Sequence, residues 1–351
     1  MLSEKLLNWY QEYGRQLPWR GIDNAYFIWL SEIILQQTRI EQGRSYYEHF
    51  IHEYPTVRHL ADASEEQVLK SWQGLGYYSR ARNLHAAAQH IAYDLGGVFP
   101  STYEGIASLK GVGRYTAAAI ASFAFRLPYP VIDGNVYRFI SRLYGIYTPI
   151  GTNQAYKEFE QVLLRVIDRE RPDLFNQAIM DFGSTYCKPT SCDCESCIFR
   201  QECVAFKQGK VALLPVKPQP VAVKERYFYY IDIRWHERGE MMLMHKREAG
   251  DIWQGLYELP LYESENPIAD EEMQERIAAV LKGWLGAAPA TLEAEQSLTH
   301  KLTHRTIKAQ FLQAKYDVRP PKIPQKLEAF EVQETKSLPI SRLIDRYLSK
   351  L

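Results

Sequence analysis

The sequence predicts a multidomain protein, with an all-α first domain and an α+β second domain. From residue 1 to about 206, apolar residues mostly recur at helical spacing between glycine and proline breaks. Beyond residue 224, RYFYYIDIRW and MMLMHKRE read as strands joined by a turn at ERGE, and HRTIKAQFLQAKY alternates like a further strand. DEEMQERIAAVLKGWLG reads as a helix. The stretch between the two regions contains three prolines and no helical period, so we expect a linker over residues 207–223.

Composition and charge set limits on the function. A chain of 351 residues is long enough for two or three domains, and its composition is typical of a soluble globular protein. The formal net charge is zero, so a case for nucleic-acid binding must rest on local features. No apolar run is long enough for a membrane helix, and the N-terminus has no secretory signal pattern. We therefore expect a cytoplasmic monomer.

All five cysteines lie close together near the end of the first domain. Four of them have the spacing Cys187-x6-Cys194-x2-Cys197-x5-Cys203, and thiolates this close can hold one [4Fe–4S] cluster. Zinc is the alternative, although zinc sites usually use two CxxC pairs and only one occurs here. Cys192 does not fit the spacing, and we expect it to be a bystander thiol.

The segment LKGVGRYTAAAI, residues 109–120, predicts a tight turn before a helix. Gly111 and Gly113 permit positive φ angles and close backbone approach. A turn followed by a helix N-terminus points several N–H groups outward, which is an arrangement that binds phosphate without reading the base sequence. An ordinary packing corner between two helices is the alternative.

Glu32 lies in the nearly continuous apolar segment AYFIWLSEIILQQTRIEQ. In a helix it shares a face with Ile28, Trp29 and Leu35. Burial among such neighbours raises the pKa of a carboxyl group and suits it to act as a general acid. An exposed glutamate at a helix rim is the alternative.

Asp133 stands between a proline-rich extended segment and the helix expected after VIDG. Aspartate is favoured as an N-cap at such a position. Hydrogen bonds from helix N–H groups would lower the pKa of Asp133 and keep it ionised. A protonated acid paired with an ionised carboxylate is the arrangement that hydrolyses glycosidic bonds.

The hairpin, the aspartate after it and the cysteine spacing together resemble the helix–hairpin–helix DNA glycosylases of the endonuclease III superfamily. Those proteins share a hairpin of the LPGVGRxTA type, and here Lys110 stands where proline is usual. The segments WLSEIILQQTR, GLGYYSRARNLH, VIDGNVYR and FNQAIMDFGSTYC resemble the MutY adenine DNA glycosylase branch. This resemblance covers essentially the whole chain.

The resemblance implies a division of the chain and an activity. Residues 1–206 would be the catalytic domain, with a six-helix part at about 18–126 and an iron–sulfur part from 1–17 and 127–206. The implied enzyme is a monofunctional glycosylase of base excision repair. It would flip out adenine mispaired with 8-oxoguanine or guanine in double-stranded DNA and remove it by hydrolysis.

The resemblance also implies roles for single residues. Glu32 would protonate N7 of adenine and help to activate water, Asp133 would stabilise the oxocarbenium-like sugar, and Asn135 would orient the Asp133 region. The positions matched to DNA or to the adenine pocket are Arg20, Gln37, Thr38, Tyr77, Gly111, Val112, Gly113 and Gln177. Among these, Gln37 and Tyr77 match the wedge that fills the gap in the duplex, and Arg20 and Gln177 match the adenine pocket. Plain packing is the alternative for Tyr77 and Gln177.

The second domain, residues 224–351, resembles the Nudix-like domain of the same family. Leu261 stands where a Nudix hydrolase needs its first metal-binding glutamate, so we do not expect pyrophosphatase activity. Family members recognise 8-oxoguanine through a loop that usually reads Phe-Ser-His, and the matching residues here are Leu302, Thr303 and His304. The Thr303 hydroxyl can hydrogen-bond the lesion, whereas Leu302 lacks the aromatic ring.

Two other functions are possible for this fold. A bifunctional glycosylase–lyase needs a lysine amine to form a Schiff base with the sugar. Related lyases carry that lysine directly after GVGR, where this chain has Tyr115. A non-catalytic iron–sulfur protein that binds DNA or transfers electrons is the other alternative. We expect Tyr115 to hydrogen-bond near Asp133 or the DNA, and water to complete the reaction.

Overall fold

The computed structural model describes residues 2–219 and 223–350, so residues 220–222 of the expected linker lie outside the described residues. The chain forms two compact units. The first comprises Met1–Asp62 and Ala86–Gln219, and the second comprises Ala63–His85 and Pro220–Leu351. The division into 1–206, 207–223 and 224–351 stays a prediction, and the second compact unit differs from it by including residues 63–85.

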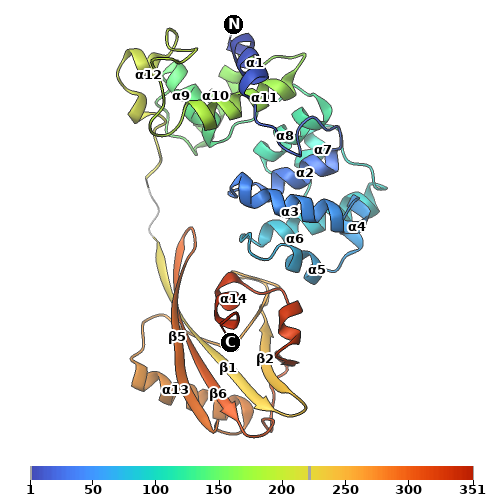
Figure 1. Ribbon diagram of the computed structural model, residues 1–351, viewed down its shortest axis with the longest axis vertical. Helices are drawn as coiled ribbons and strands as arrows, with labels where there is room; N and C mark the ends of the chain where they lie inside the picture. Colours follow the sequence, from blue (N-terminus) through green and yellow to red (C-terminus); the bar gives the residue numbers. More distant parts are fainter. Residues whose placement is uncertain (1, 220–222, 351) are drawn as a thin grey trace. The chain divides into compact units, whose positions relative to one another are not determined.

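The first unit is helical (Figure 1), as its apolar periodicity predicts. Its α-helices are α1 (Leu2–Tyr13), α2 (Ala25–Ile34), α3 (Ile40–Glu53), α4 (Val57–Asp62), α7 (Tyr103–Ala107), α8 (Arg114–Phe125), α9 (Gly134–Tyr144), α10 (Asn153–Val166), α11 (Pro172–Asp181) and α12 (Val204–Lys207), together with the C-terminal end, residues 86–89, of α6 (Ser79–Gln89), whose larger part belongs to the second unit. Two π-helical turns, His90–Asp94 and Phe182–Tyr186, continue α6 and α11.

Aromatic side chains from α1, α9, α10 and α11 form a core in this unit. Phe139, Phe159, Phe175 and Phe182 are at most 3% exposed, and three cysteines pack at the margin of the same cluster. Burial of each such ring contributes roughly 1.5–3 kcal/mol. The core therefore places α9 and α11 firmly beside the cysteine loop.

The segment expected as a linker is partly tied to the first unit. A 3-10 turn covers Val211–Leu213, and the Val216 carbonyl accepts a hydrogen bond of 2.9 Å from the Ile150 N–H. The Leu214 carbonyl accepts another, of 3.0 Å, from Nε of the buried Arg142. Proline content correctly indicated the lack of a long helix, but these long-range contacts have no signal in the local sequence.

The second unit is built on one mixed sheet. Its strands are β1 (Lys224–His236), β2 (Glu240–Lys246), β3 (Tyr257–Glu258), β4 (Leu261–Ser264), β5 (Thr291–Lys301), β6 (Arg305–Tyr316) and β7 (Leu327–Glu331). The order is β3-β2-β1-β6-β5, with β4 paired to β1 and β7 paired to β2. β1 and β6 are parallel, and the other pairs of named strands are antiparallel.

This unit confirms the α+β prediction and adds elements to it. β1, β2, β6 and the helix α13 (Asp270–Leu285) occur where the sequence predicts them. β5 was not predicted, because nearly all of its side chains are exposed or half-buried and it lacks an apolar face of strict period two. The short helices α5 (Glu65–Ser71) and α14 (Arg342–Leu348) complete the unit.

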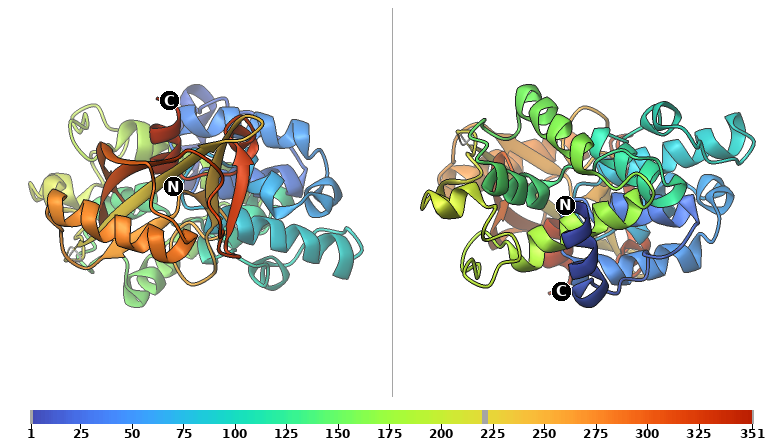
Figure 2. Two further views of the ribbon diagram at one scale, coloured as in Figure 1. Left: turned by 90° about the horizontal axis from the view of Figure 1, so that it is seen from below. Right: turned by 90° about the horizontal axis from the view of Figure 1, so that it is seen from above.

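The two faces of the sheet bury alternate residues of β1. Phe228 and Tyr230 pack with side chains of α14, whereas Ile231 and Ile233 pack with side chains of α13. Figure 2 (left) shows α13 running along one face of the sheet. A strand buried on both faces is apolar over most of its length, and β1 is so from Tyr227 to Ile231, beyond which the buried Asp232 and Arg234 pair with each other.

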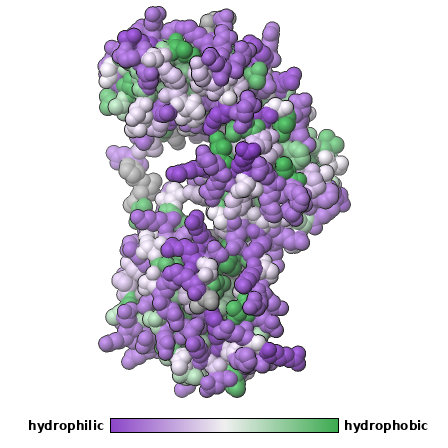
Figure 3. All heavy atoms as spheres, viewed as in Figure 1, coloured by the Kyte–Doolittle hydropathy of each residue, from purple (hydrophilic) through white to green (hydrophobic). Residues whose placement is uncertain are grey.

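Hydrophilic side chains cover most of the surface seen in Figure 3, with apolar residues scattered among them. Within residues 2–219 and 223–350, no helix has the length and hydrophobicity needed to cross a bilayer.

Candidate active site

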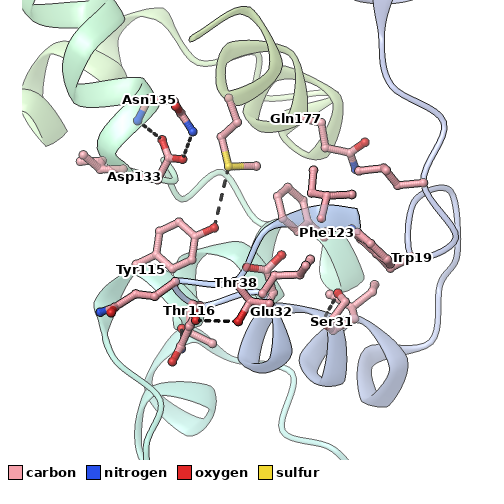
Figure 4. A pocket seen from close by; sticks show the side chains of 18 of the residues that line it. Trp19, Ser31, Glu32, Thr38, Tyr115, Thr116, Phe123, Asp133, Asn135 and Gln177 are labelled. Carbon is pink, nitrogen blue, oxygen red and sulfur yellow. Dashed lines mark hydrogen bonds between the residues drawn. The ribbon is translucent and has the colours of Figure 1, made fainter. Parts of the chain in front are cut away.

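A cavity of about 810 Å³ in the first unit brings the two predicted carboxylates together (Figure 4). Glu32 enters it from α2, and Asp133 enters from the segment just before α9. Tyr115 at the start of α8 and Gln177 on α11 also line it. Other predicted residues in its wall are Arg20, Gln37, Thr38, Gly111, Gly113 and Asn135.

Glu32 is held in an apolar wall of the cavity. Asn24 caps α2 by accepting hydrogen bonds from the N–H groups of Tyr26 and Phe27, and the helix that follows is almost entirely buried. Glu32 itself is 9% exposed. Burial raises the pKa of Glu32 to about 7, although Tyr115 and Arg20 partly offset this effect. The carboxyl group therefore retains a proton near neutral pH, as the sequence predicts.

Asp133 is the N-cap of α9. Its Oδ1 accepts hydrogen bonds from the N–H groups of Asn135 (2.9 Å) and Val136 (2.7 Å), and its Oδ2 accepts one from Asn135 Nδ2 (2.6 Å). We expected these bonds to lower the pKa of Asp133, and this expectation is wrong. Burial outweighs the hydrogen bonds and raises the pKa above its usual value.

Arg138, which the sequence analysis missed, continues this network. Its Nη2 donates to Asn135 Oδ1 (2.9 Å), and its Nε donates to the Cys187 carbonyl (2.8 Å). The Asn135 amide is thus held between Arg138 and Asp133. A chain of hydrogen bonds runs from the cysteine loop to the carboxylate, and the residues concerned are up to 54 positions apart (133 to 187).

Tyr115 lies in the first turn of α8, and Figure 4 shows its hydroxyl directed toward Met180, whose Sδ is 3.9 Å away. Burial and the neighbouring Glu32 raise its pKa well above the usual value, so the phenol stays protonated. The Tyr115 side chain in turn lowers the pKa of Glu32, in opposition to the larger effect of burial.

The two predicted adenine-pocket residues are held by partners that the sequence did not reveal. Arg20 forms a bidentate ion pair with the fully buried Asp181, with Nη–Oδ distances of 2.7 and 2.8 Å. Arg15 also pairs with Asp181. Burial opposes ionisation of Asp181, but these arginines outweigh it and lower its pKa. Tyr10 donates to Gln177 Oε1 (2.7 Å) while accepting from Arg20 (3.2 Å).

The glycine hairpin joins α7 to α8. Gly111 adopts a φ of +80°, as the sequence predicts, whereas Gly113 has a φ of −89° and serves as the N-cap of α8. Both glycines are exposed, and Val112 between them is buried at 8% exposure. Since the Val112 side chain is buried, only the main chain of Val112 can contact a ligand. Gln37 is exposed and also has a positive φ, +56°.

In the second unit, the predicted wedge and the predicted lesion loop meet. The Tyr77 hydroxyl and Thr303 Oγ1 are 2.6 Å apart, although 226 residues separate them in the sequence. Tyr77 is 48% exposed with a φ of +49°. Leu302 packs against the core of this unit, and its N–H closes the β5–β6 turn on the Arg305 carbonyl (2.8 Å). His304 is exposed.

All five cysteines, including Cys192, line one small cavity in the first unit. Arg142 Nη1 lies 3.4 Å from Cys187 Sγ, and the Phe199 N–H donates to Cys197 Sγ at 3.4 Å. Such donors stabilise thiolates. Among the residues described, no three His, Cys, Asp or Glu side chains are arranged to hold a single metal ion. Cys192 thus lies beside the four spaced cysteines, and its description as a bystander thiol stays a prediction.

Two family models match the chain. The model of the HhH-GPD superfamily of base excision DNA repair proteins matches residues 30–166, and the NUDIX domain model matches residues 232–350. These matches confirm the predicted combination of a helix–hairpin–helix domain and a Nudix-like domain.

Curated relatives and solved structures agree with the family models. An adenine DNA glycosylase of Buchnera aphidicola (Acyrthosiphon pisum) is 33% identical over 265 residues, which is 75% of each chain. The Rattus norvegicus adenine DNA glycosylase is 40% identical over 225 residues, 61% of this chain and 44% of the rat protein. A thermostable thymine-DNA glycosylase structure matches 59% of this chain and 95% of its own, with 26% identity and a TM-score of 0.55.

A DNA complex of endonuclease III has the same fold in this region, with 21% identity and a TM-score of 0.52 over 59% of this chain and 94% of that one. The carboxylate-lined cavity, the glycine hairpin and the two matched domains thus occur together, as the resemblance implied. The chain belongs to the MutY family of adenine DNA glycosylases, DNA-binding N-glycosylases of base excision repair within the helix–hairpin–helix (endonuclease III) superfamily.

Proposed function

We propose that this protein removes adenine paired with 8-oxoguanine or guanine from double-stranded DNA, by hydrolysis and without lyase chemistry. The observation that carries the chemical part is the pair of carboxyl groups in one cavity, one of which has a pKa of about 7. The observation that carries the lesion part is the contact between Tyr77 and Thr303.

The two carboxyl groups have different partners and so take different roles. Asp133 accepts three hydrogen bonds that favour its ionised form, whereas Glu32 is surrounded mainly by apolar side chains of α2. We therefore assign the proton to Glu32, whose burial raises its pKa to about 7, and the negative charge to Asp133, whose hydrogen bonds oppose the effect of its own burial. Glu32 is the proton donor, and Asp133 is the negative charge that stabilises the cationic sugar.

The reaction follows from these roles. Glu32 donates its proton to N7 of the flipped adenine, the C1′–N9 bond breaks, and adenine leaves as a neutral base. Asp133, held by Asn135, stabilises positive charge at C1′. The Glu32 carboxylate then takes a proton from water as the water oxygen bonds to C1′, which leaves an abasic site. Proton and charge are balanced, and Glu32 returns to its acid form.

Arg20 and Gln177 position the base for this protonation. Arg20 donates to Tyr10, so the Tyr10 hydrogen is directed to Gln177 Oε1 and the Gln177 amide presents its NH₂ group to the cavity. An NH₂ group donates to a ring nitrogen of adenine. Water enters as the nucleophile because Tyr115 has no amine to form a Schiff base.

The Tyr77–Thr303 contact joins the duplex wedge to lesion recognition. A threonine hydroxyl both donates and accepts, so it can bond Tyr77 and the N7–H or O8 of 8-oxoguanine at once. Guanine has neither an N7–H group nor an O8 atom. Thr303 is therefore the residue that distinguishes the lesion from guanine.

The test is single-turnover release of adenine from duplexes that pair it with 8-oxoguanine, guanine or thymine. We expect the fastest release opposite 8-oxoguanine, and absence of release there would refute the proposal. Thr303→Val should reduce the preference for 8-oxoguanine over guanine by about tenfold, the effect of one lost hydrogen bond of roughly 1–2 kcal/mol. Thr299→Val, at an exposed position of β5, is the matched control and should leave the preference unchanged.

Borohydride trapping separates hydrolysis from lyase chemistry. We expect no covalent protein–DNA product under conditions that trap a lysine imine. A stable crosslink that maps to a single lysine would contradict the monofunctional assignment.

We further propose that Cys187, Cys194, Cys197 and Cys203 hold a [4Fe–4S] cluster. Their sulfurs border one cavity, and N–H donors from Arg142 and Phe199 point at two of them. The bound cluster would supply rigidity to the loop whose carbonyl at Cys187 orients Arg138. Iron and sulfide analysis of protein purified without oxygen tests this, and zinc in place of iron would contradict it.

A further inference from the structure

The cysteine loop places five thiols at a site that needs four. We propose that Cys192 is a second ligand for the iron assigned to Cys194, so that two interchangeable thiolates serve one corner of the cluster. This inference rests on the proposed [4Fe–4S] site.

Cys192 faces the same cavity as the four spaced cysteines. Its Sγ lies 3.5 Å from Cys194 Sγ, which is van der Waals contact between the two sulfurs. Cys192 is also half-buried, as are the other four cysteines. Its sulfur is therefore directed inward, next to the sulfur that the spacing assigns as a ligand.

The buried guanidinium of Arg142 lies close to the sulfurs of both Cys187 and Cys192. Arg142 is 3% exposed, and its Nη1 lies 3.4 Å from Cys187 Sγ and 3.8 Å from Cys192 Sγ. The same guanidinium is held by the carbonyls of Lys188 and Pro189. The Arg142 guanidinium therefore lies within hydrogen-bonding distance of both sulfurs.

The local backbone permits exchange without refolding the loop. Cys192 and Cys194 are separated only by Asp193, and the Cys194 N–H bonds the Cys192 carbonyl at 3.1 Å. With a cluster bound, the Cys192 thiol would lose its proton to solvent on becoming a ligand, and the displaced Cys194 thiolate would take up a proton. No electron is transferred and no further reactant is needed.

The other ligand positions have no such reserve in the described part of the chain. Cys197 Sγ accepts from the Phe199 N–H, and Cys203 Sγ donates to the Arg142 carbonyl. Within the described part of the chain, neither sulfur forms a hydrogen bond with another sulfur. Loss of Cys197 therefore has a different consequence from loss of Cys194, and this difference makes the inference testable.

The experiment compares full-length variants Cys194→Ala, Cys192→Ala, Cys197→Ala and the Cys192→Ala/Cys194→Ala double variant, each purified without oxygen. Iron and sulfide per chain are measured, together with the electron paramagnetic resonance spectrum of the oxidised cluster. We expect Cys194→Ala and Cys192→Ala each to retain the cluster with an all-thiolate spectrum. Cys194→Ala should hold at least about fivefold more iron than Cys197→Ala and than the double variant.

Circular dichroism identifies any variant that fails to fold. If the double variant fails to fold, the comparison of Cys194→Ala with Cys197→Ala still tests the inference. Iron in Cys194→Ala as low as in Cys197→Ala overturns the inference, and so does loss of iron in Cys192→Ala. If the wild-type protein itself contains no iron, the proposed cluster fails, and this outcome is distinct from the other two.

Discussion

Replacing Glu32 by glutamine removes an ionisable group from an apolar wall while preserving shape and hydrogen-bonding capacity. Glu32 is 9% exposed, and its surroundings raise its pKa from 4.5 to about 7. The substitution therefore tests catalysis and the energetic cost of the site in one variant.

The magnitude follows from proton linkage. The folded protein holds the Glu32 proton more tightly than the unfolded chain, so stability is highest below the unfolded pKa and decreases as pH rises toward about 7. The full difference corresponds to roughly 3 kcal/mol, of which about 2 kcal/mol develops between about pH 5.5 and pH 8. Glutamine does not ionise, so its stability lacks this dependence on pH. The free energy of unfolding of the variant, relative to that of the wild type, should therefore increase by about 2 kcal/mol between about pH 5.5 and pH 8.

The assay is urea unfolding, monitored by tryptophan fluorescence at about pH 5.5 and about pH 8. Single-turnover adenine release is measured on the same preparations. Release should fall by a factor of about 10² to 10⁴, the usual contribution of a general acid. The reasoning is refuted if the stability difference does not change with pH, or if the variant retains its rate. Glu65→Gln, at an exposed position of α5, controls for the loss of a charge alone.

The remaining predictions concern the groups around this acid. Since Glu32 must be protonated, the wild-type rate of adenine release should fall with rising pH above about 7, and a flat profile from pH 6 to 9 would contradict the role of Glu32. Arg138→Gln breaks the chain from the Cys187 carbonyl to Asn135, so release should slow by about 10- to 100-fold with little change in DNA affinity, as gel-shift titration would show. Asp181→Asn leaves two arginines without their buried partner and should lower the free energy of unfolding by about 3–5 kcal/mol. Asp168→Asn, at a more exposed ion pair, should cost no more than about 1 kcal/mol in the same urea titration.

Local pattern was sufficient for several parts of this protein. The apolar periodicity around Glu32 predicts both a buried helix and a carboxyl group with a raised pKa, because an apolar helix packs into the interior and takes a carboxyl group that it carries out of water. The residues of RYFYYIDIRW likewise predict a strand, which is β1. Positive φ at Gly111 follows from the need for a tight turn before α8.

Other properties depend on residues distant in the sequence. Hydrogen bonds to Asp133 come from the adjacent helix and were predictable, but the burial that overcomes them was not. Arg138, Asp181 and Cys192 carry no local motif, and their roles emerge only from partners on other elements or across a shared cavity.

The amino-acid sequence by itself determined the helical and mixed domains, the cysteine spacing and the two carboxylates, because each of these is a matter of local period or spacing. Tertiary structure alone decided the direction of the Asp133 pKa shift, the partners that hold Arg20 and Gln177, and the contact of Tyr77 with Thr303. The physical reason is that desolvation and long-range hydrogen bonding depend on what covers a residue in space, and neighbours in the chain do not specify that cover.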